Sequence, residues 1–400
     1  MESLAHASIA RFAGIIRLDG RLEDADARHM AAALRLARKA AGRTSPNPLV
    51  GAVVVRNGRV VGSGYHRRAG EPHAEVDALR QAGPRARGAT LYVTLEPCNH
   101  VGRTPPCCDA ILRAGIARVV VAAIDPNPIT NGRGIARLRR AGLRVVTGVR
   151  RRQAEALNAP FRKAMTARLP YAIAKIGQSL DGKIATSRGE SRWITSPASR
   201  RLAHRLRREA DAVLVGVTTV LRDDPRLTVR GVPRRPGHPV KVIVDSRLRT
   251  PPTARCLNAS TAPAMVATTS RSASRIARLR ARGAEVIRVA SRGGRVPLRP
   301  LFRRLVQRGI HSVLIEGGGE LLASALRERL VDRVAWFIAP RLIGGRRAPG
   351  AVGGDGIRRL GQAVRVEGMT CRRVGADLFI EGRVEYPTSR NTPHATSDRS

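Results

Sequence analysis

Apolar positions in the first part of the chain switch repeatedly between a helical period and the alternation typical of strands. Between the strand patterns Val50–Val55 and Val60–Ser63, the pair Asn57-Gly58 suits a two-residue hairpin turn. Further strands are predicted over Thr90–Leu95, Val119–Ile124 and Arg144–Thr147, and helices over Glu23–Ala41, His73–Ala82, Cys107–Ala114 and Ile135–Ala141. Strands and helices that alternate over about 140 residues predict an α/β layer.

A second alternating run follows the basic, largely helical stretch Arg150–Pro170. Its predicted strands are Tyr171–Ile176, Ala212–Gly216, Val240–Asp245, Ala264–Thr268, Val286–Val289, Ser312–Glu316 and Arg333–Ile338, and its helices are Pro197–Glu209, Leu298–Arg308 and Leu321–Arg329. We therefore expect two α/β domains, residues 24–168 and 169–386. Residues 1–23 are expected to be an extension, and the polar, aperiodic residues 387–400 a disordered tail.

The chain is strongly basic. Of its 400 residues, 73 are Lys or Arg and 30 are Asp or Glu, which gives a formal net charge of +43. This charge raises the expectation of a nucleic-acid partner. However, aromatic residues, which stack on bases, make up only 3%, and the basic residues are scattered along the chain. Since only five of them are Lys, a broad bias toward Arg explains the charge better, and we expect no specific nucleic-acid partner.

The sequence also bears on the compartment. No run of about 18 uncharged apolar residues is present, so neither a transmembrane helix nor a membrane partner is expected. The first residues lack the basic start and long apolar run of a secretory signal. Five cysteines are no disulfide scaffold in a chain of this length, and the odd count favours a reducing compartment. A cytoplasmic location is therefore predicted.

Four residues of the first domain suit a site at which zinc activates a water for hydrolysis. His73 starts a predicted helix, Cys98 follows a strand, and Cys107 opens another helix. One imidazole and two thiolates suit Zn²⁺, and three protein ligands leave a fourth position for a water that ionises near neutral pH. Glu75 can pass a proton from that water to a departing amine. A similar His-x-Glu and Pro-Cys pattern is typical of nucleobase deaminases.

Two neighbours compete as ligands. Cys108 points about 100° away from Cys107 around a helix, so only one of the two can face the metal. We choose Cys107 because it repeats the Pro-Cys setting of Cys98, and His100 is the other rival. The alternative for the whole set is structural, since a lone His-x-Glu pair is usually solvated and a lone buried Cys is usually a small hydrophobic residue.

The segments around these residues resemble a family of bifunctional riboflavin-biosynthesis deaminase/reductases, over about residues 24–385. The resembling segments are Ser45–Ala52, Gly64–His66, Thr94–Cys107 and Asp125–Pro128. The resemblance implies a cytidine-deaminase-like three-layer α/β/α domain that deaminates a phosphoribosylated diaminopyrimidinone. It also implies that Asn47 contacts this substrate, although a turn residue between two prolines explains Asn47 equally well. Asn131 departs from the Ala that is common in the family.

The second domain lacks the G-x-G-x-x-G of a Rossmann site after an early strand. Instead, the strand Ser312–Glu316 runs into Gly317, Gly318 and Gly319 before a helix. Backbone N–H groups at a helix start bind phosphate, and glycine permits a close approach. Taken alone, three glycines are more simply a tight turn.

Other segments of this domain resemble the reductase half of the same family, which is similar in fold to dihydrofolate reductase. They are Lys175–Ala185, Gly189–Thr195, Asp211–Gly216, Asp223–Thr228, Asp332-Arg333 and Ala339–Gly345. The resemblance implies NADPH as the hydride donor that converts a ribosyl group to a ribityl chain. It implies a cofactor site lined by Gly177, Thr219, Glu316, Gly317, Gly318 and Gly319, and a substrate site formed by Ser191, Trp193, Arg207, Asp223, Leu227 and Arg230.

The chemistry of these side chains suits those roles. Arg207 and Arg230 can fork onto a phosphate, Asp223 can bind sugar hydroxyls, and Trp193 can wall the pocket. The alternatives are a core position for Trp193 and a plain surface position for each Arg. Gln178 stands where the family usually has a small or apolar residue. Because the reductase family tends to self-associate, a homo-oligomer is expected.

Three hypotheses follow. The first is a bifunctional enzyme that deaminates 2,5-diamino-6-(5-phosphoribosylamino)pyrimidin-4(3H)-one with zinc and then reduces the product with NADPH to 5-amino-6-(5-phosphoribitylamino)uracil. The second, a nucleic-acid deaminase, leaves the second domain unexplained. The third, a binding or regulatory protein with one inactive half, is disfavoured for the deaminase because the metal ligands and Glu75 are all present.

Overall fold

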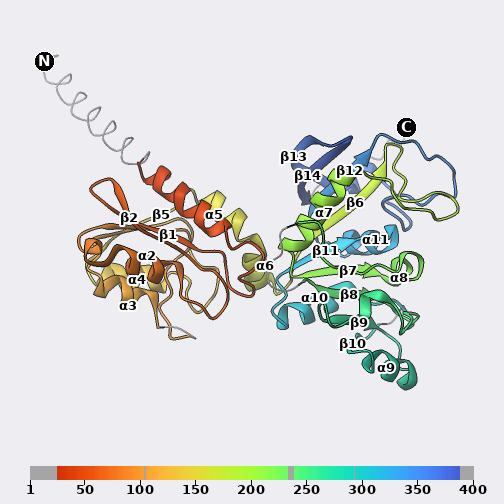
Figure 1. The fold of residues 1–400 in the computed structure, drawn as a ribbon, viewed down its shortest axis with the longest axis horizontal. Coiled ribbons are helices and arrows are strands. Elements are labelled where there is room, and N and C mark those ends of the chain that lie inside the picture. The colour runs from red at the N-terminus through yellow and green to blue at the C-terminus, as the bar shows by residue number, and fades with distance from the viewer. Residues whose placement is uncertain (1–24, 103–104, 233–237, 292, 388–400) are drawn as a thin grey trace, which may run out of the picture. The chain divides into compact units, whose positions relative to one another are not determined.

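The computed structural model describes residues 25–102, 105–232, 238–291 and 293–387 (Figure 1). These residues form two compact units, which are divided between Ala167 and Arg168. The predicted N-terminal extension and all of the predicted tail except Pro387 lie outside the described residues. In the described part of the chain, no helix is long and apolar enough to cross a membrane.

The N-terminal unit contains a five-stranded sheet in the order β2-β1-β3-β4-β5. Strand β1 is antiparallel to both β2 and β3, whereas β3, β4 and β5 are parallel. The strands are β1 (Gly51–Arg56), β2 (Arg59–Tyr65), β3 (Thr90–Val93), β4 (Arg118–Val121) and β5 (Arg144–Thr147). The helices are residues 25–38, α2 (Ala74–Ala82), α3 (Cys107–Arg113), α4 (Arg133–Arg140), α5 (Arg151–Leu157) and α6 (Ala159–Ala167), with a 3₁₀ turn at Gly83–Ala86.

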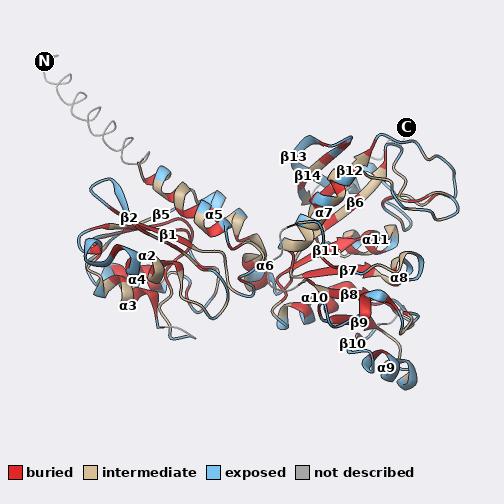
Figure 2. Ribbon diagram, viewed as in Figure 1, coloured by how far each residue is buried: buried red, intermediate tan, exposed pale blue. Residues whose placement is uncertain are grey.

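Helices cover both faces of this sheet (Figure 2). Ala52 and Val54 of β1 pack with residues of α2, α3 and α4, whereas Val53 and Val55 pack with helix 25–38, α5 and α6. The alternation follows from the strand period of two. Asn57 and Gly58 have φ angles of 51° and 75°, as the hairpin requires. The predicted three-layer α/β/α arrangement is confirmed.

Two glycines of β2 set the position of α2. A Cβ atom on Gly62 would lie 2.2 Å from the carbonyl oxygen of Ala78, and one on Gly64 would lie 2.3 Å from that of Ala74. Only glycine therefore allows α2 to pack so closely against β2. This contact fixes the start of α2, where His73 and Glu75 lie.

The C-terminal unit contains a nine-stranded sheet in the order β10-β9-β8-β7-β11-β6-β12-β14-β13. All neighbours from β10 to β12 are parallel, and β14 and β13 add an antiparallel hairpin. The strands are β6 (Tyr171–Ser179), β7 (Ala212–Gly216), β8 (Val240–Val244), β9 (Ala264–Thr268), β10 (Ala284–Arg288), β11 (Ser312–Glu316), β12 (Val331–Ala339), β13 (Arg365–Val374) and β14 (Asp377–Glu385). The helices are α7 (Pro197–Glu209), α8 (Val217–Asp223), α9 (Ala273–Arg280), α10 (Leu298–Gln307) and α11 (Gly319–Arg327), with 3₁₀ turns at Arg255–Leu257 and Leu360–Gln362.

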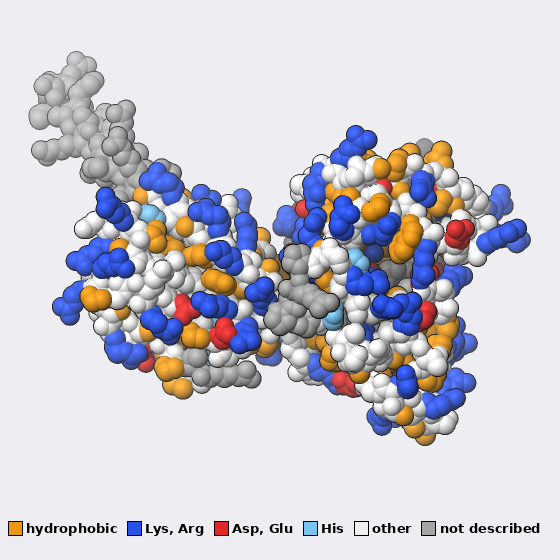
Figure 3. All heavy atoms as spheres, in the orientation of Figure 1, with side chains coloured by type: hydrophobic (Ala, Val, Ile, Leu, Met, Phe, Trp, Pro, Cys, Tyr) orange, Lys and Arg blue, Asp and Glu red, His pale blue; other side chains and the backbone are white. Residues whose placement is uncertain are grey.

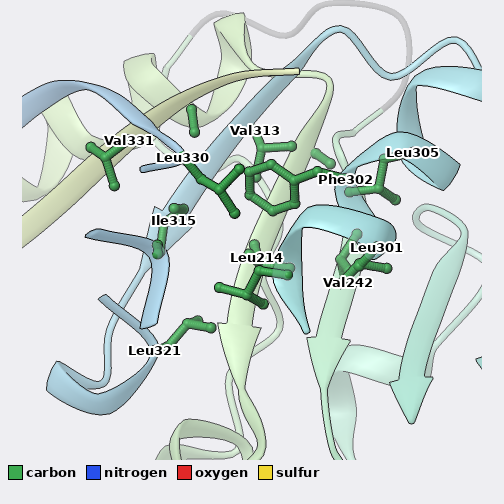
Figure 4. Close-up of a cluster of buried hydrophobic side chains, with 14 of the residues drawn as sticks. Leu214, Val242, Leu301, Phe302, Leu305, Val313, Ile315, Leu321, Leu330 and Val331 are labelled. Carbon is green, nitrogen blue, oxygen red and sulfur yellow. The ribbon is translucent and has the colours of Figure 1, made fainter. Parts of the chain in front are cut away.

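The core of this unit lies on both faces of its sheet. On one face, side chains of α10 and α11, such as Phe302 and Leu321, pack against the strands. The strand residues in this cluster include Leu214, Val242, Val313 and Ile315 (Figure 4). On the other face, a second cluster includes residues of α8 and α9. The predicted α/β class is confirmed for this unit, and α8, α9, β13 and β14 are additions to the predicted elements.

Candidate active sites

Three side chains of the N-terminal unit converge. His73 is the extended residue before α2, Cys107 opens α3, and Cys98 lies in the loop after β3. The Nδ1 atom of His73 is 3.1 Å from Sγ of Cys107 and 3.6 Å from Sγ of Cys98. All three ligand atoms lie within 4.8 Å of one another. This donor set and spacing fit a tetrahedral Zn²⁺ with one position left for water.

A buried carboxylate accompanies the cluster. Glu75 is 3% exposed, and its Oε2 has no hydrogen-bond partner within the described part of the chain. Burial raises the pKa of Glu75 to about 7, which suits a group that accepts and returns a proton. Hydrogen bonds from Cys107 and His73 lower the pKa of Cys98 to about 4, which favours the thiolate, the form that binds metal.

The rival ligands lie elsewhere. Sγ of Cys108 is 3.7 Å from the carbonyl oxygen of Pro97 and 3.8 Å from that of Gly134, and the residue belongs to the hydrophobic core. His100 lies outside the three-residue cluster but lines the adjoining pocket. Its Nδ1 is buried and has no partner among the residues that the structure describes.

A pocket of about 350 Å³ opens over the cluster. Asn47 and His66 both line it, and Nδ2 of Asn47 lies 3.0 Å from Nε2 of His66. Because Nδ1 of His66 lies 3.1 Å from the carbonyl oxygen of Pro72, which can only accept, Nδ1 carries the proton and Nε2 accepts from Asn47. The amide oxygen of Asn47 is then free of this bond and available to a ligand.

Several pocket residues were not assigned from the sequence. His66, His100, Asp125 and Asn127 line the pocket beside the metal cluster. All four belong to segments that carry the family resemblance, which was the available signal. Burial raises the pKa of Asp125 to about 6, so this carboxyl also titrates close to neutral pH.

In the C-terminal unit, a buried ion pair lies at the end of β11. Arg207 of α7 donates from Nε to Oε1 of Glu316 at 2.6 Å and from Nη2 to Oε2 at 2.7 Å. Nζ of Lys175 lies 3.4 Å from the same carboxylate. Burial acts to raise the pKa of Glu316, but the charges of Arg207 and Lys175 outweigh burial and lower this pKa to about 2. Arg207 also donates from Nη1 to the carbonyl oxygen of Thr228, so much of its donor capacity is already used.

The predicted cofactor residues lie around the turn after β11. Gly317 and Gly318 have φ angles of 73° and 74°, and α11 begins at Gly319. A Cβ atom on Gly317 would lie 3.1 Å from Oγ1 of Thr219. Thr219 and the three glycines therefore come together at a helix start, the geometry that binds phosphate. Gly177 lies on β6, against Thr195.

The predicted substrate residues come partly together. Ser191 donates from Oγ to Oδ1 of Asp223 at 3.2 Å. Trp193 is 59% exposed and stacks with Arg200, so it is no core residue. Leu227 is buried with a φ angle of 53°, and the exposed Arg230 donates its backbone N–H to Nδ1 of His204.

His204 was also missed. It lies three residues before Arg207 on α7, and that helical spacing was the available signal. Burial, together with the charges of Arg207 and Arg230, lowers the pKa of His204 to about 4. Nothing in the structure explains why Asn131 and Gln178 depart from the family pattern.

Comparisons with known proteins match both units. Residues 23–123 match the cytidine and deoxycytidylate deaminase zinc-binding region, and residues 170–380 match the RibD C-terminal domain. The riboflavin biosynthesis protein RibD of Aquifex aeolicus is 47% identical over 90% of this chain and 98% of its own length. That of Escherichia coli is 42% identical over 89% and 98%, respectively.

Solved structures agree. RibD of Acinetobacter baumannii matches with a TM-score of 0.83 and 38% identity over 91% of this chain and 99% of its own. A diaminohydroxyphosphoribosylaminopyrimidine deaminase/5-amino-6-(5-phosphoribosylamino)uracil reductase of Thermotoga maritima matches with a TM-score of 0.78 and 34% identity over the same shares. These matches confirm the predicted fold class of both units. The chain belongs to the RibD family and is a bifunctional enzyme of riboflavin biosynthesis, a zinc-dependent deaminase and an NADPH-dependent reductase.

Proposed function

We propose that residues 24–168 deaminate 2,5-diamino-6-(5-phosphoribosylamino)pyrimidin-4(3H)-one and that residues 169–386 reduce the deaminated product to 5-amino-6-(5-phosphoribitylamino)uracil. The observation that carries the proposal is the cluster of His73, Cys98 and Cys107 beside the buried Glu75; His73, Cys98 and Glu75 line one pocket. The double name of the Thermotoga maritima relative supports this order of substrates.

In the deaminase, His73, Cys98 and Cys107 would hold the metal. When bound, Zn²⁺ would supply a water with a lowered pKa. The carboxylate of Glu75 would accept a proton and deliver it to the departing amine, because burial raises its pKa to about 7, in the range for both steps. Asn47, oriented by His66, offers its amide oxygen to an N–H group of the pyrimidine ring.

In the reductase, the helix start at Gly317, Gly318 and Gly319 receives a phosphate of NADPH, with Thr219 beside it and Gly177 on β6. NADPH supplies the hydride. Ser191 and Asp223, already hydrogen-bonded together, face the sugar, and Trp193 walls the site. Leu227 and Arg230 lie on one segment, whose exposed Arg230 is the better placed cation for the substrate phosphate. Arg207 is paired with Glu316, so it adds positive charge near the substrate site without contacting the phosphate directly.

One variant tests the deaminase assignment. Glu75→Gln keeps the size of the side chain but removes the proton acceptor. We expect ammonia release to fall by at least about 100-fold, with zinc content and reduction of the deaminated product unchanged. Asp77→Asn is the matched control, because Asp77 follows on the same helix but pairs with Arg80 at the surface. Full deaminase activity in Glu75→Gln overturns the assignment.

We also propose that the chain acts in the cytoplasm as a homo-oligomer. None of the five cysteines forms a disulfide in the part of the chain that the structure describes, as a reducing compartment allows. Strand β13 lies at the edge of its sheet, is exposed along nearly its whole length and carries the exposed Val366 and Met369. An exposed apolar edge strand favours pairing with a second copy. Light scattering should give a multiple of the 43.1 kDa chain mass, and Met369→Lys should shift it toward the monomer.

A further inference from the structure

Glu96 is a buried carboxylate two residues before the proposed zinc ligand Cys98. It is 3% exposed and receives four backbone N–H groups. Oε1 accepts from Gly134 at 3.0 Å and from Ile135 at 3.2 Å. Oε2 accepts from Gly132 at 2.8 Å and from Asp125 at 3.2 Å. One side chain thereby joins the loop after β3, the loop after β4 and the start of α4.

Helix α4 depends on this carboxylate for its N-terminal cap. Its N-cap residue, Gly132, has no side chain, and no acidic residue lies in its first turn. The first N–H groups of a helix lack partners within the helix and carry partial positive charge. The negative charge of Glu96 satisfies both needs from outside the helix.

The loop is also tied to α4 on the other side of Cys98. Arg137 of α4 donates from Nη1 to Oδ1 of Asn99 at 2.7 Å, and its Nη2 lies 2.5 Å from Oδ1 of Asp109 on α3. Between these ties, a Cβ atom on Gly134 would lie 2.0 Å from the carbonyl oxygen of Pro97, so α4 packs directly on the loop. The residues before and after Cys98 are therefore held by one helix.

We propose that Glu96 is a positioning residue of the deaminase: by fastening the Cys98 loop to α4, it sets where the Cys98 thiolate meets the metal. The same carboxylate holds the backbone of Asp125, which lines the pocket, so ligand and pocket wall share one anchor. The inference rests on the proposed zinc site. Groups that orient metal ligands from behind typically change metal affinity or activity by about 10- to 100-fold when removed.

Glu96→Gln tests the proposal in the full chain. The variant keeps the shape of the side chain but replaces one carboxylate oxygen, which accepts two N–H groups, with an NH₂ group. Because an NH₂ group is itself a donor, it cannot accept these two hydrogen bonds. We expect zinc affinity, measured by competition with a chelator, to fall by about 10- to 100-fold. We also expect the absorption of the Co²⁺-loaded protein to change, because the thiolate geometry changes. Deaminase kcat should fall more than KM rises, and NADPH-dependent reduction of the deaminated product should not change.

Glu328→Gln is the matched control. Glu328 caps α10 in the other unit in the same way, accepting the N–H groups of Leu298 and Arg299 at 2.9 and 2.7 Å. This variant should leave zinc affinity and the Co²⁺ spectrum as in the unmodified chain. If Glu96→Gln does not fold, Asn99→Ala tests the inference in its place, because it removes only the hydrogen bond to Arg137. We then expect a smaller change in the absorption spectrum of the Co²⁺-loaded protein.

Two results overturn the inference. One is Glu96→Gln with unchanged zinc affinity and Co²⁺ spectrum, and the other, where that variant does not fold, is Asn99→Ala with an unchanged spectrum. Either result leaves the proposed function standing if the unmodified chain binds zinc and deaminates. An unmodified chain that binds no zinc overturns the proposed function itself.

Discussion

Arg207 and Glu316 lie 109 residues apart in the sequence, yet their side chains meet in a two-pronged, buried ion pair. The contact joins α7 to the end of β11, immediately before the glycine turn at Gly317. Lys175 of β6 adds a second cation to the same carboxylate. The pair therefore links the proposed cofactor turn to the helix that faces the proposed substrate site, and it leaves one excess positive charge beneath both.

Removing this carboxylate should destabilise the C-terminal unit. Glu316→Gln leaves Arg207 and Lys175 buried without their counter-charge, a change that typically costs about 3–5 kcal/mol. Calorimetry should show the transition of this unit at lower temperature, and reductase activity should fall while ammonia release persists. Glu285→Gln, which breaks the more exposed pair with Arg308, should cost less than about 1 kcal/mol. Equal losses in the two variants contradict the account.

The stability of the same unit should depend on pH through His204. Its pKa falls from 6.5 to about 4 on folding, so between these values the unfolded chain binds a proton that the folded chain does not. Stability from the neutral side chain is therefore fully present above pH 6.5 and is lost as the pH falls toward 4. His204→Gln should flatten the pH dependence of the unfolding midpoint in this window. An unchanged slope contradicts the shift.

Two adjacent thiols should differ sharply in their effect on zinc. Cys107 and Cys108 are both fully buried, but only Cys107 lies in the ligand cluster. Cys107→Ala should lose most of the zinc, about one ion per chain in the unmodified protein, and with it ammonia release. Cys108→Ala should keep both, with some loss of stability from the core. Metal analysis of the two purified variants decides, and zinc loss from Cys108→Ala instead would reverse the ligand assignment.

The glycine turn should be sensitive to a single methyl group. Gly317→Ala forces a side chain into a left-handed conformation and against Thr219. We expect the dissociation constant for NADPH to rise about tenfold, equivalent to about 1.4 kcal/mol of binding free energy. Gly293→Ala is the control, because a Cβ atom there meets no atom of the described residues within 4 Å. Fluorescence titration with NADPH compares the two, and equal affinities would separate this turn from the cofactor.

Local sequence signals predicted most of the fold. Periodicity identified β1, β2 and their turn, because Asn57-Gly58 determines its own backbone. It did not identify β13, because nine of the ten residues of that strand are exposed and no alternation marks them. Helix α8 was missed because its seven residues follow β7 directly, without a separating loop.

The candidate sites also contain features that the sequence could predict and features that it could not. Chemistry and spacing selected His73, Cys98 and Cys107, which the structure brings together, because metal ligands are recognisable by residue type. The same spacing selected Glu75, which the structure buries beside them. The four contacts of Glu96 could not be predicted, since its partners are backbone N–H groups that any residue carries. The pairing of Arg207 with Glu316 depends on the order of strands in the sheet, which periodicity does not determine.

The proposed function requires one chain to carry out two consecutive reactions at two sites. NADPH oxidation with the phosphoribosylated diaminopyrimidinone as the only substrate tests this requirement most directly. Zinc-loaded chain should oxidise NADPH and release ammonia in equal amounts. Glu75→Gln should do neither with this substrate, and it should oxidise NADPH, still without releasing ammonia, once the deaminated product is added. NADPH oxidation by Glu75→Gln without that addition, or ammonia release by the unmodified chain with no NADPH oxidation, would contradict the account.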